Sequence, residues 1–127
     1  MIYLDVEDLA DIAARVLNPQ AVVIRDIGLL SMSAHRPQTS VFGHEPYPTT
    51  ADKAAALLVS ITMNRPLQDG NKRLALAATW VFCGLNAGRQ PDMTNDAAYD
   101  LVMGVARGEL DMPDVAAALE KAGISET

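Results

Sequence analysis

The side chains best suited to chemistry lie together in the stretch Asp69-Gly70-Asn71-Lys72-Arg73, directly before a long apolar run. A glycine at a helix start lets the backbone approach a ligand closely. The first backbone N–H groups of a helix have no partner within it and lie at the positive end of the helix dipole, so they can bind an anion. Lys72 adds a point charge there, and Arg73 adds a guanidinium that can bind two phosphate oxygens. The stretch therefore predicts a phosphate-binding helix start.

Asp69 and Asn71 could complete this site. A carboxylate such as that of Asp69 can hold Mg2+ through one or two oxygens, while water and phosphate fill the remaining positions. Asn71 could donate to a phosphate and also brace the loop. An ordinary helix start, with Asp69 as its N-cap and a solvated basic face, is the alternative interpretation. We disfavour it because positive charges are unfavourable in the first turn of a helix, so Lys72 and Arg73 need a further reason to be there.

Six helical segments position this stretch, and together they predict an all-α protein. The predicted helices begin at or just after Asp5, Asp26, Thr49, Gly70, Thr94 or Asn95, and Asp111, and they end near Asn18, Pro37, Met63, Asn86, Gly108 and Gly123. The segment from residue 71 to residue 86 is apolar nearly all round, which predicts that it is the central buried helix. Between the second and third helices, residues 38–47 predict a short hairpin or extended flap with a turn at Gly43-His44.

The composition favours one domain, residues 1–127, in which 50% hydrophobic residues can form a core without disulfides or metals. The net charge of −6 argues against broad nucleic-acid binding, so no direct nucleic-acid partner is expected. The single cysteine, Cys83, lies in an apolar run and is predicted to be a buried thiol. The N-terminus is too acidic for a signal peptide and the apolar runs are too short to cross a bilayer, so we expect a cytoplasmic protein without a membrane partner.

Extended to Asn64–Arg73, the stretch resembles the active-site loop of the Fic/Doc superfamily, and specifically its Doc (death-on-curing) branch. The family pattern is His-Pro-Phe-x-Asp-Gly-Asn-Lys-Arg followed by a helix. The matching residues are Pro66, Asp69, Gly70, Asn71, Lys72 and Arg73, with Leu67 in place of the aromatic residue. Similar stretches elsewhere are Asp26–Leu30, Arg36–Gln38, Phe42-Gly43, Tyr47-Pro48 and the run around Tyr99. The resemblance covers roughly residues 3–120 and implies a compact Fic-fold helical bundle of about six helices with a short flap.

Two positions make the chain similar to the kinase branch rather than to other Fic proteins, which usually transfer AMP. Those proteins have glycine where Lys72 stands, and a second arginine where this chain has Leu76. The resemblance therefore implies the toxin of a toxin–antitoxin pair, a protein kinase that transfers the γ-phosphate of ATP to a threonine of translation elongation factor Tu. It also implies a small Phd-like antitoxin whose C-terminal segment folds into a groove on the toxin.

The resemblance also implies a role for each matching residue. Asp69 would position Mg2+ or the phosphates, and the amides of Gly70 and Asn71, with the Asn71 side chain, would cradle the phosphates. Lys72 and Arg73 would neutralise charge on the transferred phosphoryl group and its leaving group. The flap, formed by Val41, Phe42, Gly43 and His44, would dock the target segment beside the loop by strand-like pairing.

Arg65 stands where the family has its catalytic histidine, which takes the proton from the attacking hydroxyl. Arginine stays protonated in proteins and cannot serve as a base. Loss of such a base typically costs roughly 100- to 10,000-fold in rate, so we expect this chain to be impaired. His35 and His44 are the only histidines, and both are interpreted as surface residues rather than substitute bases.

Several alternatives stay open from the sequence. Arg65 could mark a naturally degenerate copy, an introduced inactivating substitution, or a kinase that works through another base. We favour the introduced substitution, because an active toxin is hard to express. The chain could also be a non-catalytic module that binds nucleotide or antitoxin, or it could transfer AMP.

Overall fold

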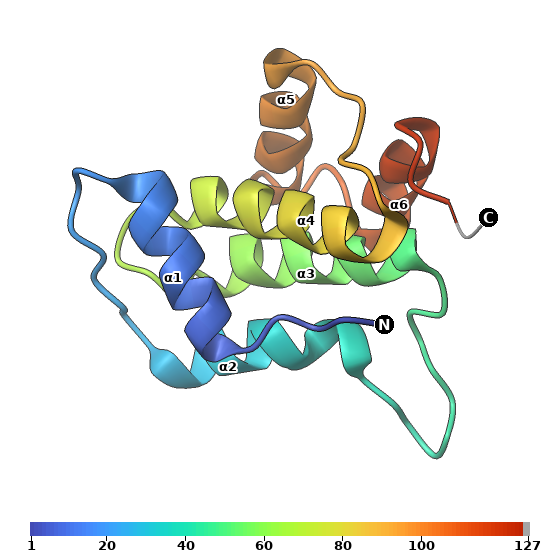
Figure 1. The fold of residues 1–127 in the computed structure, drawn as a ribbon, viewed down its shortest axis with the longest axis horizontal. Coiled ribbons are helices and arrows are strands. Elements are labelled where there is room, and N and C mark those ends of the chain that lie inside the picture. The colour runs from blue at the N-terminus through green and yellow to red at the C-terminus, as the bar shows by residue number, and fades with distance from the viewer. Residues whose placement is uncertain (126–127) are drawn as a thin grey trace.

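The structure, a computed structural model, describes residues 1–125 as an all-helical protein (Figure 1). The helices are α1 (Val6–Leu17), α2 (Ile27–His35), α3 (Thr50–Asn64), α4 (Asn71–Ala87), α5 (Asn95–Ala106) and α6 (Met112–Lys121), and a short 3-10 helix, η1 (Arg36–Gln38), follows α2. These residues form no sheet, only two isolated antiparallel bridges. The prediction of an all-α fold with six helices is confirmed; the last two residues of the predicted domain, 126 and 127, lie outside the described range.

The predicted helix starts are confirmed because the expected side chains cap them. Asp5, Thr49 and Asp111 each accept a hydrogen bond from the backbone of the third helical residue, in reciprocal capping boxes. Asp26 and Thr94 accept the equivalent bond without the reciprocal one, so Thr94 rather than Asn95 caps α5. The chain therefore encodes its helix starts locally, through short polar side chains.

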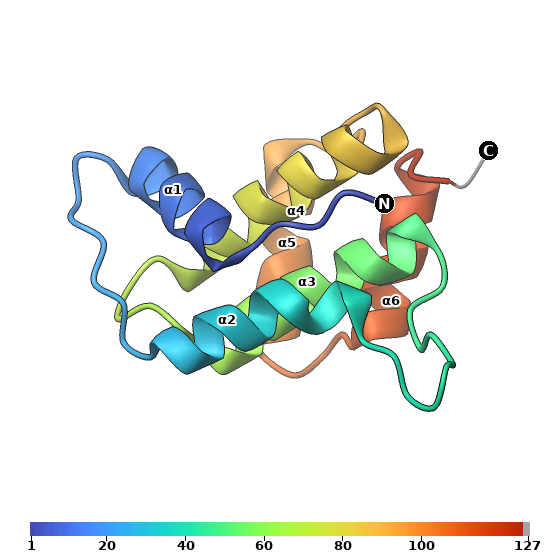
Figure 2. The same ribbon diagram turned by 60° about the horizontal axis from the view of Figure 1, so that its bottom comes forward.

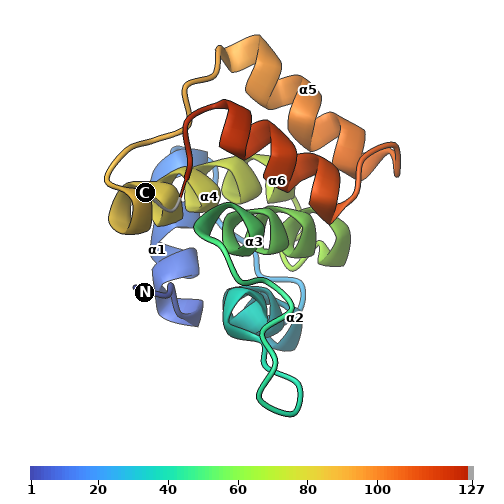
Figure 3. The same ribbon diagram turned by 90° about the vertical axis from the view of Figure 1, so that its right-hand side faces the viewer.

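The helix at the centre of the molecule is α3, so the prediction that residues 71–86 form the central helix is wrong. Most residues of α3 are buried, including the run Ala54–Leu58, and α3 contacts α2, η1, α4, α5 and α6 (Figure 3). In contrast, α4 exposes Val81 and Leu85. The physical reason is side-chain size. The small alanine side chains of α3 let neighbouring helices approach it on every side, and the count of apolar residues in a helix does not show this.

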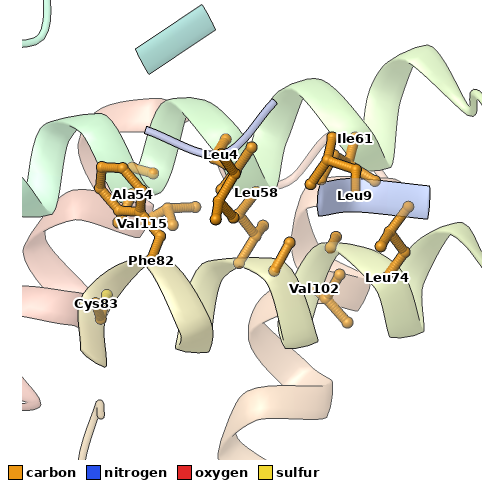
Figure 4. Packing of buried hydrophobic residues seen from close by; sticks show 14 of the residues in the cluster. Leu4, Leu9, Ala54, Leu58, Ile61, Leu74, Phe82, Cys83, Val102 and Val115 are labelled. Carbon is orange, nitrogen blue, oxygen red and sulfur yellow. The ribbon is translucent and has the colours of Figure 1, made fainter. Parts of the chain in front are cut away.

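The core lies between these two helices and the elements packed on them (Figure 4). Phe82 of α4 is fully buried and its ring lies 6.4 Å from that of Tyr3, on the segment before α1. Cys83 is buried as predicted, and burial raises the pKa of its thiol to about 12. No helix among residues 1–125 is long and apolar enough to span a membrane.

This arrangement separates two connecting segments. The C-terminal end of α1, the C-terminal end of α3 and the N-terminal end of α4 meet at the left of Figure 1, with the connector from α1 to α2 beside them. The flap emerges at the other end of α3, at the lower right of Figures 1 and 2. A helix of 15 residues such as α3 spans about 22 Å. The loop after α3 and the flap before it therefore occupy opposite ends of the molecule.

Candidate active site

The loop between α3 and α4 is closed by the side chain of Asn71, the first residue of α4. The Oδ1 atom of Asn71 accepts a hydrogen bond from the backbone N–H of Leu67 at 2.8 Å, and its Nδ2 atom donates to the carbonyl of Leu67 at 2.9 Å. Both residues are buried. The bracing role predicted for Asn71 is thus present in the structure, and a phosphate contact by its side chain stays a prediction.

The connector from α1 to α2 runs antiparallel along this loop. The backbone N–H groups of Arg25 and Asp26 both donate to the carbonyl of Pro66, at 2.8 and 3.1 Å, and the N–H of Gln68 donates to the carbonyl of Val23 at 2.9 Å. The side chain of Arg25 adds two further bonds: its Nε donates to the carbonyl of Arg65 and its Nη2 to that of Asn64, both at 2.8 Å. These carbonyls would otherwise have no partner at the end of a helix, so Arg25 caps α3 and fixes the loop.

Two features require a glycine at position 70: a left-handed backbone and the close approach of Leu17. Its φ is 92°, in the left-handed region, and a Cβ added there would lie 2.6 Å from Cδ1 of Leu17, the last residue of α1. The close approach of a ligand that the sequence predicts at this glycine stays a prediction. The structure adds a second reason, which is the close approach of α1.

A cavity of about 280 Å³ opens beside the loop and brings together five of the ten predicted site residues. Its lining residues are Thr62, Met63, Arg65, Gln68, Asp69, Gly70, Asn71, Lys72 and Ala106. The backbone N–H groups of Asn71, Lys72 and Arg73 have no acceptor within residues 1–125, as expected for the first turn of a helix. The cavity therefore lies at the positive end of α4.

The charged side chains that line this cavity differ in their partners. The side chains of Arg65 and Lys72 make no hydrogen bond or ion pair with any of the described residues. Asp69 accepts from its neighbour's backbone N–H, that of Gly70, at 2.9 Å and from Nε2 of Gln20 at 3.3 Å. Asp69 is the one carboxylate among the residues that line the cavity. Residues 1–125 hold no cluster of three or more possible metal ligands. One carboxylate fits a magnesium ion that takes its remaining ligands from phosphate and water.

Arg73 points in a different direction from Lys72, since successive helical residues are rotated by about 100° around the axis of α4. It lines a separate cavity of about 320 Å³, with apolar neighbours that include Leu76 and Trp80. Its Nη2 donates to Oε1 of Gln20 at 2.9 Å. Gln20 therefore bridges Arg73 and Asp69, and the structure does not bring Arg73 into the first cavity.

Gln20 and Arg25 are the residues that the sequence reasoning missed. Both lie in the connector between α1 and α2, where neither apolar periodicity nor a helix cap draws attention to them. Their partners are at least 39 positions away in the chain. The indirect signal was the connector itself, a Pro-containing segment of nine residues outside any helix, because its backbone N–H and C=O groups need hydrogen-bond partners elsewhere.

The structure does not bring the flap to the cavity. Val41 and His44 exchange two backbone hydrogen bonds of 2.8 and 2.9 Å around a tight turn, which confirms a turn within the predicted flap. Phe42, at the tip, is fully exposed. The flap projects at the far end of α3 (Figure 2), and neither His35 nor His44 lines the cavity. Docking of a target by the flap stays a prediction.

The fold and the loop together define a class: a helical protein in which α3 and α4 are joined by a short braced loop, and α4 begins with unpaired backbone N–H groups beside a cavity. Residues 3–83, which include this loop, match the Fic/DOC family. The chain belongs to the Fic/DOC family. It is similar to a curated relative, Toxin Doc of Mycolicibacterium smegmatis (strain ATCC 700084 / mc(2)155), with 42% identity over 118 residues that cover 92% of this chain and 90% of the relative.

Proposed function

We propose that this chain is the toxin of a toxin–antitoxin pair, with the site of an ATP-dependent protein kinase whose turnover is impaired by Arg65. The observation that carries the proposal is the cavity at the start of α4. It collects unpaired backbone N–H groups, the carboxylate of Asp69 and the ammonium of Lys72. The relative named Toxin Doc supports the toxin assignment over nearly the whole chain.

In this proposal the first turn of α4 binds the phosphates of ATP. The N–H groups of Asn71 and Lys72 donate to phosphate oxygens, and the Lys72 ammonium offsets negative charge as the phosphoryl group transfers. Asp69 would hold Mg2+, which when bound would neutralise part of the phosphate charge. The backbone N–H of Gly70 donates a hydrogen bond to the Asp69 carboxylate, so in this conformation it is not available to a phosphate.

The step that fails is removal of a proton. A target hydroxyl oxygen would attack the γ-phosphorus while the bond from that phosphorus to the bridging oxygen breaks and ADP leaves. The hydroxyl proton must pass to a base, and the guanidinium at position 65 has no free lone pair to accept it. We therefore assign the chain a competent phosphate site and a missing base.

The decisive experiment restores the histidine. The chain and its Arg65→His version are incubated with labelled ATP, Mg2+ and elongation factor Tu. We expect at least about 100-fold more transfer from the histidine version, the usual contribution of a positioned base. Arg65→Gln is the control, because it removes the positive charge without supplying a base, and it should stay inactive. No transfer from the histidine version would sink the kinase proposal. Intact mass then distinguishes an added phosphate from an added AMP, and Leu76 leads us to expect phosphate.

A non-catalytic role is the second candidate, and the unpaired guanidinium beside the cavity favours it. In that case Arg65→His restores no transfer, yet calorimetry still detects binding of ATP or of an antitoxin. A Phd-like antitoxin is the proposed partner in either case. A short upstream reading frame that encodes an acidic, helix-prone C-terminus supports that partner, and an unrelated neighbouring gene contradicts it.

A further inference from the structure

We propose that Arg65 binds phosphate groups directly and allows this cavity to retain a polyphosphate chain without magnesium. The inference rests on the nucleotide site proposed above and concerns what the substitution adds, beyond the base that it removes. In this proposal, either Arg65 or Mg2+ can neutralise the negative charge of the bound phosphates.

Arg65 and Lys72 approach the cavity from two different helix ends. Arg65 follows the last residue of α3, and Lys72 is the second residue of α4. Both side chains are exposed and without a partner within residues 1–125. The backbone beneath the guanidinium is fixed, because Arg25 binds the carbonyl of Arg65 at 2.8 Å. A cation on a fixed backbone loses less conformational freedom when it binds an anion.

Thr62 provides an independent observation. It lies in the last turn of α3 and lines the same cavity, and it is only 5% exposed. Its Oγ1 atom is buried and has no hydrogen-bond partner. A buried hydroxyl without a partner is costly and uncommon, so it points to a missing acceptor or donor. An anion in this cavity would supply the acceptor once the Thr62 side chain turns toward it, because Oγ1 is inaccessible in the present conformation; the hydroxyl of Thr79 in α4 is likewise buried and without a partner.

The charges at the cavity have the opposite balance to the whole chain. The chain carries a net charge of −6, whereas the cavity has two unpaired cations and the positive end of α4 against the one carboxylate of Asp69. That carboxylate is already held by Gln20 and by the N–H of Gly70. A metal-free polyphosphate is more negative than its magnesium complex, so it gains more from such a site. With a neutral histidine at position 65, Lys72 would be the one cation, and a metal ion would be needed.

The test is a binding cycle in which Arg65 and the metal are removed separately and together. Affinities for ATP and for inorganic triphosphate are measured at one ionic strength, with excess Mg2+ or with EDTA, for the chain and for Arg65→Gln. In EDTA we expect Arg65→Gln to weaken binding about tenfold, as for loss of one charge-assisted contact. In Mg2+ we expect a loss of less than about threefold, because the metal then offsets the same charge. Glutamine meets the same backbone strain as arginine at this left-handed position, so the comparison isolates the charge.

Two variants keep the cycle interpretable. Arg89→Gln removes an arginine beyond the far end of α4 and should leave every affinity unchanged, because added salt screens charges at that separation. Thr62→Val should weaken triphosphate binding a few-fold with and without metal, because the hydroxyl contact does not depend on charge.

Several outcomes would overturn the inference. One is an Arg65→Gln affinity for ATP in EDTA that stays within twofold of the unchanged chain. Another is the same loss with and without metal, and a third is binding of ATP but not of inorganic triphosphate. None of these depends on turnover, so they are distinguishable from failure of the Arg65→His version to transfer phosphate.

Discussion

The segments on either side of α3 each contain a non-glycine residue with a left-handed backbone, and different contacts hold the two residues in place. Among the described residues, the two non-glycine residues with positive φ are Arg65, at 51°, directly after α3, and Phe42, at 50°, in the flap before it. Around Arg65, backbone and side-chain hydrogen bonds from the connector hold the chain on both sides. Around Phe42, the turn is bonded only to itself, through Val41 and His44.

The flap is nevertheless anchored at its base. Lys53 of α3 is almost fully buried, and its ammonium donates to the carboxylate of Glu45 at 3.2 Å and to the carbonyl of Tyr47. Arg36 donates to the Tyr47 hydroxyl at 2.9 Å and lies over its ring. The loop that carries Arg65 is thus held by hydrogen bonds along its length. The flap is held only at its base, and its tip makes no hydrogen bond with the rest of the described residues beyond its own turn.

The largest effect should come from Gly70→Ala, because the new methyl group meets Leu17 at 2.6 Å and the backbone is left-handed. We expect a loss of about 3 kcal/mol in the free energy of unfolding, from overpacking and strain together. The matched control is Gly88→Ala, at a φ of 71° with nothing within 4 Å, which should cost only about 1 kcal/mol. Denaturant titration measures both, and equal losses would contradict the contact with α1.

Asn71→Ala should follow, with a loss of about 2 kcal/mol in the free energy of unfolding. The substitution leaves the N–H and the carbonyl of Leu67 buried without partners. Asn95→Ala changes an exposed asparagine in the first turn of α5 and should stay within about 0.5 kcal/mol. If the two variants unfold at the same denaturant concentration, the loop does not depend on this brace.

These two predictions also mark what the sequence could and could not give. Helix caps and the loop motif are local patterns, so the six helices and the residues around Asp69 were predictable. The contacts made by Gln20 and Arg25 are long-range and have no local pattern, and the central place of α3 depends on small side chains rather than on hydrophobicity. Lys72 and Arg73 line different cavities, because adjacent helical residues point in different directions, and a phosphate contact by Arg73 stays a prediction.

Arg25→Gln tests whether the connector fixes the loop. We expect a loss of about 1 kcal/mol in the free energy of unfolding, since Arg25 is exposed and its bonds compete with water. The local effect should be clearer: amide exchange should accelerate at Gln68, whose N–H is bonded to the same connector. Arg15→Gln, another exposed arginine, is the control and should leave that amide unchanged. Unchanged exchange in Arg25→Gln as well would mean that the backbone contacts alone fix the loop.

Lys53→Met makes the complementary test at the flap. Replacing a buried charged side chain by an apolar one of similar length often changes stability little. Glu45 is exposed enough to be hydrated after it loses its partner. The free energy of unfolding should therefore change by less than about 1 kcal/mol. The amides of Val41 and His44 should nevertheless exchange faster, because the base of the flap loses an anchor. Glu45→Gln should show a smaller acceleration. If Lys53→Met leaves both amides unchanged, the turn is stable without its base.

The smallest effect should be a gain. Phe42 adopts a left-handed conformation that costs a phenylalanine roughly 1 kcal/mol or more, and its fully exposed ring recovers none of that by packing. Asparagine tolerates this conformation, so Phe42→Asn should raise the free energy of unfolding by about 0.5 kcal/mol. Ser40→Asn, outside the turn, should have no effect. A loss of stability in Phe42→Asn would show that the ring packs in solution. A gain would show that the left-handed backbone at position 42 costs the chain stability that the exposed ring does not recover.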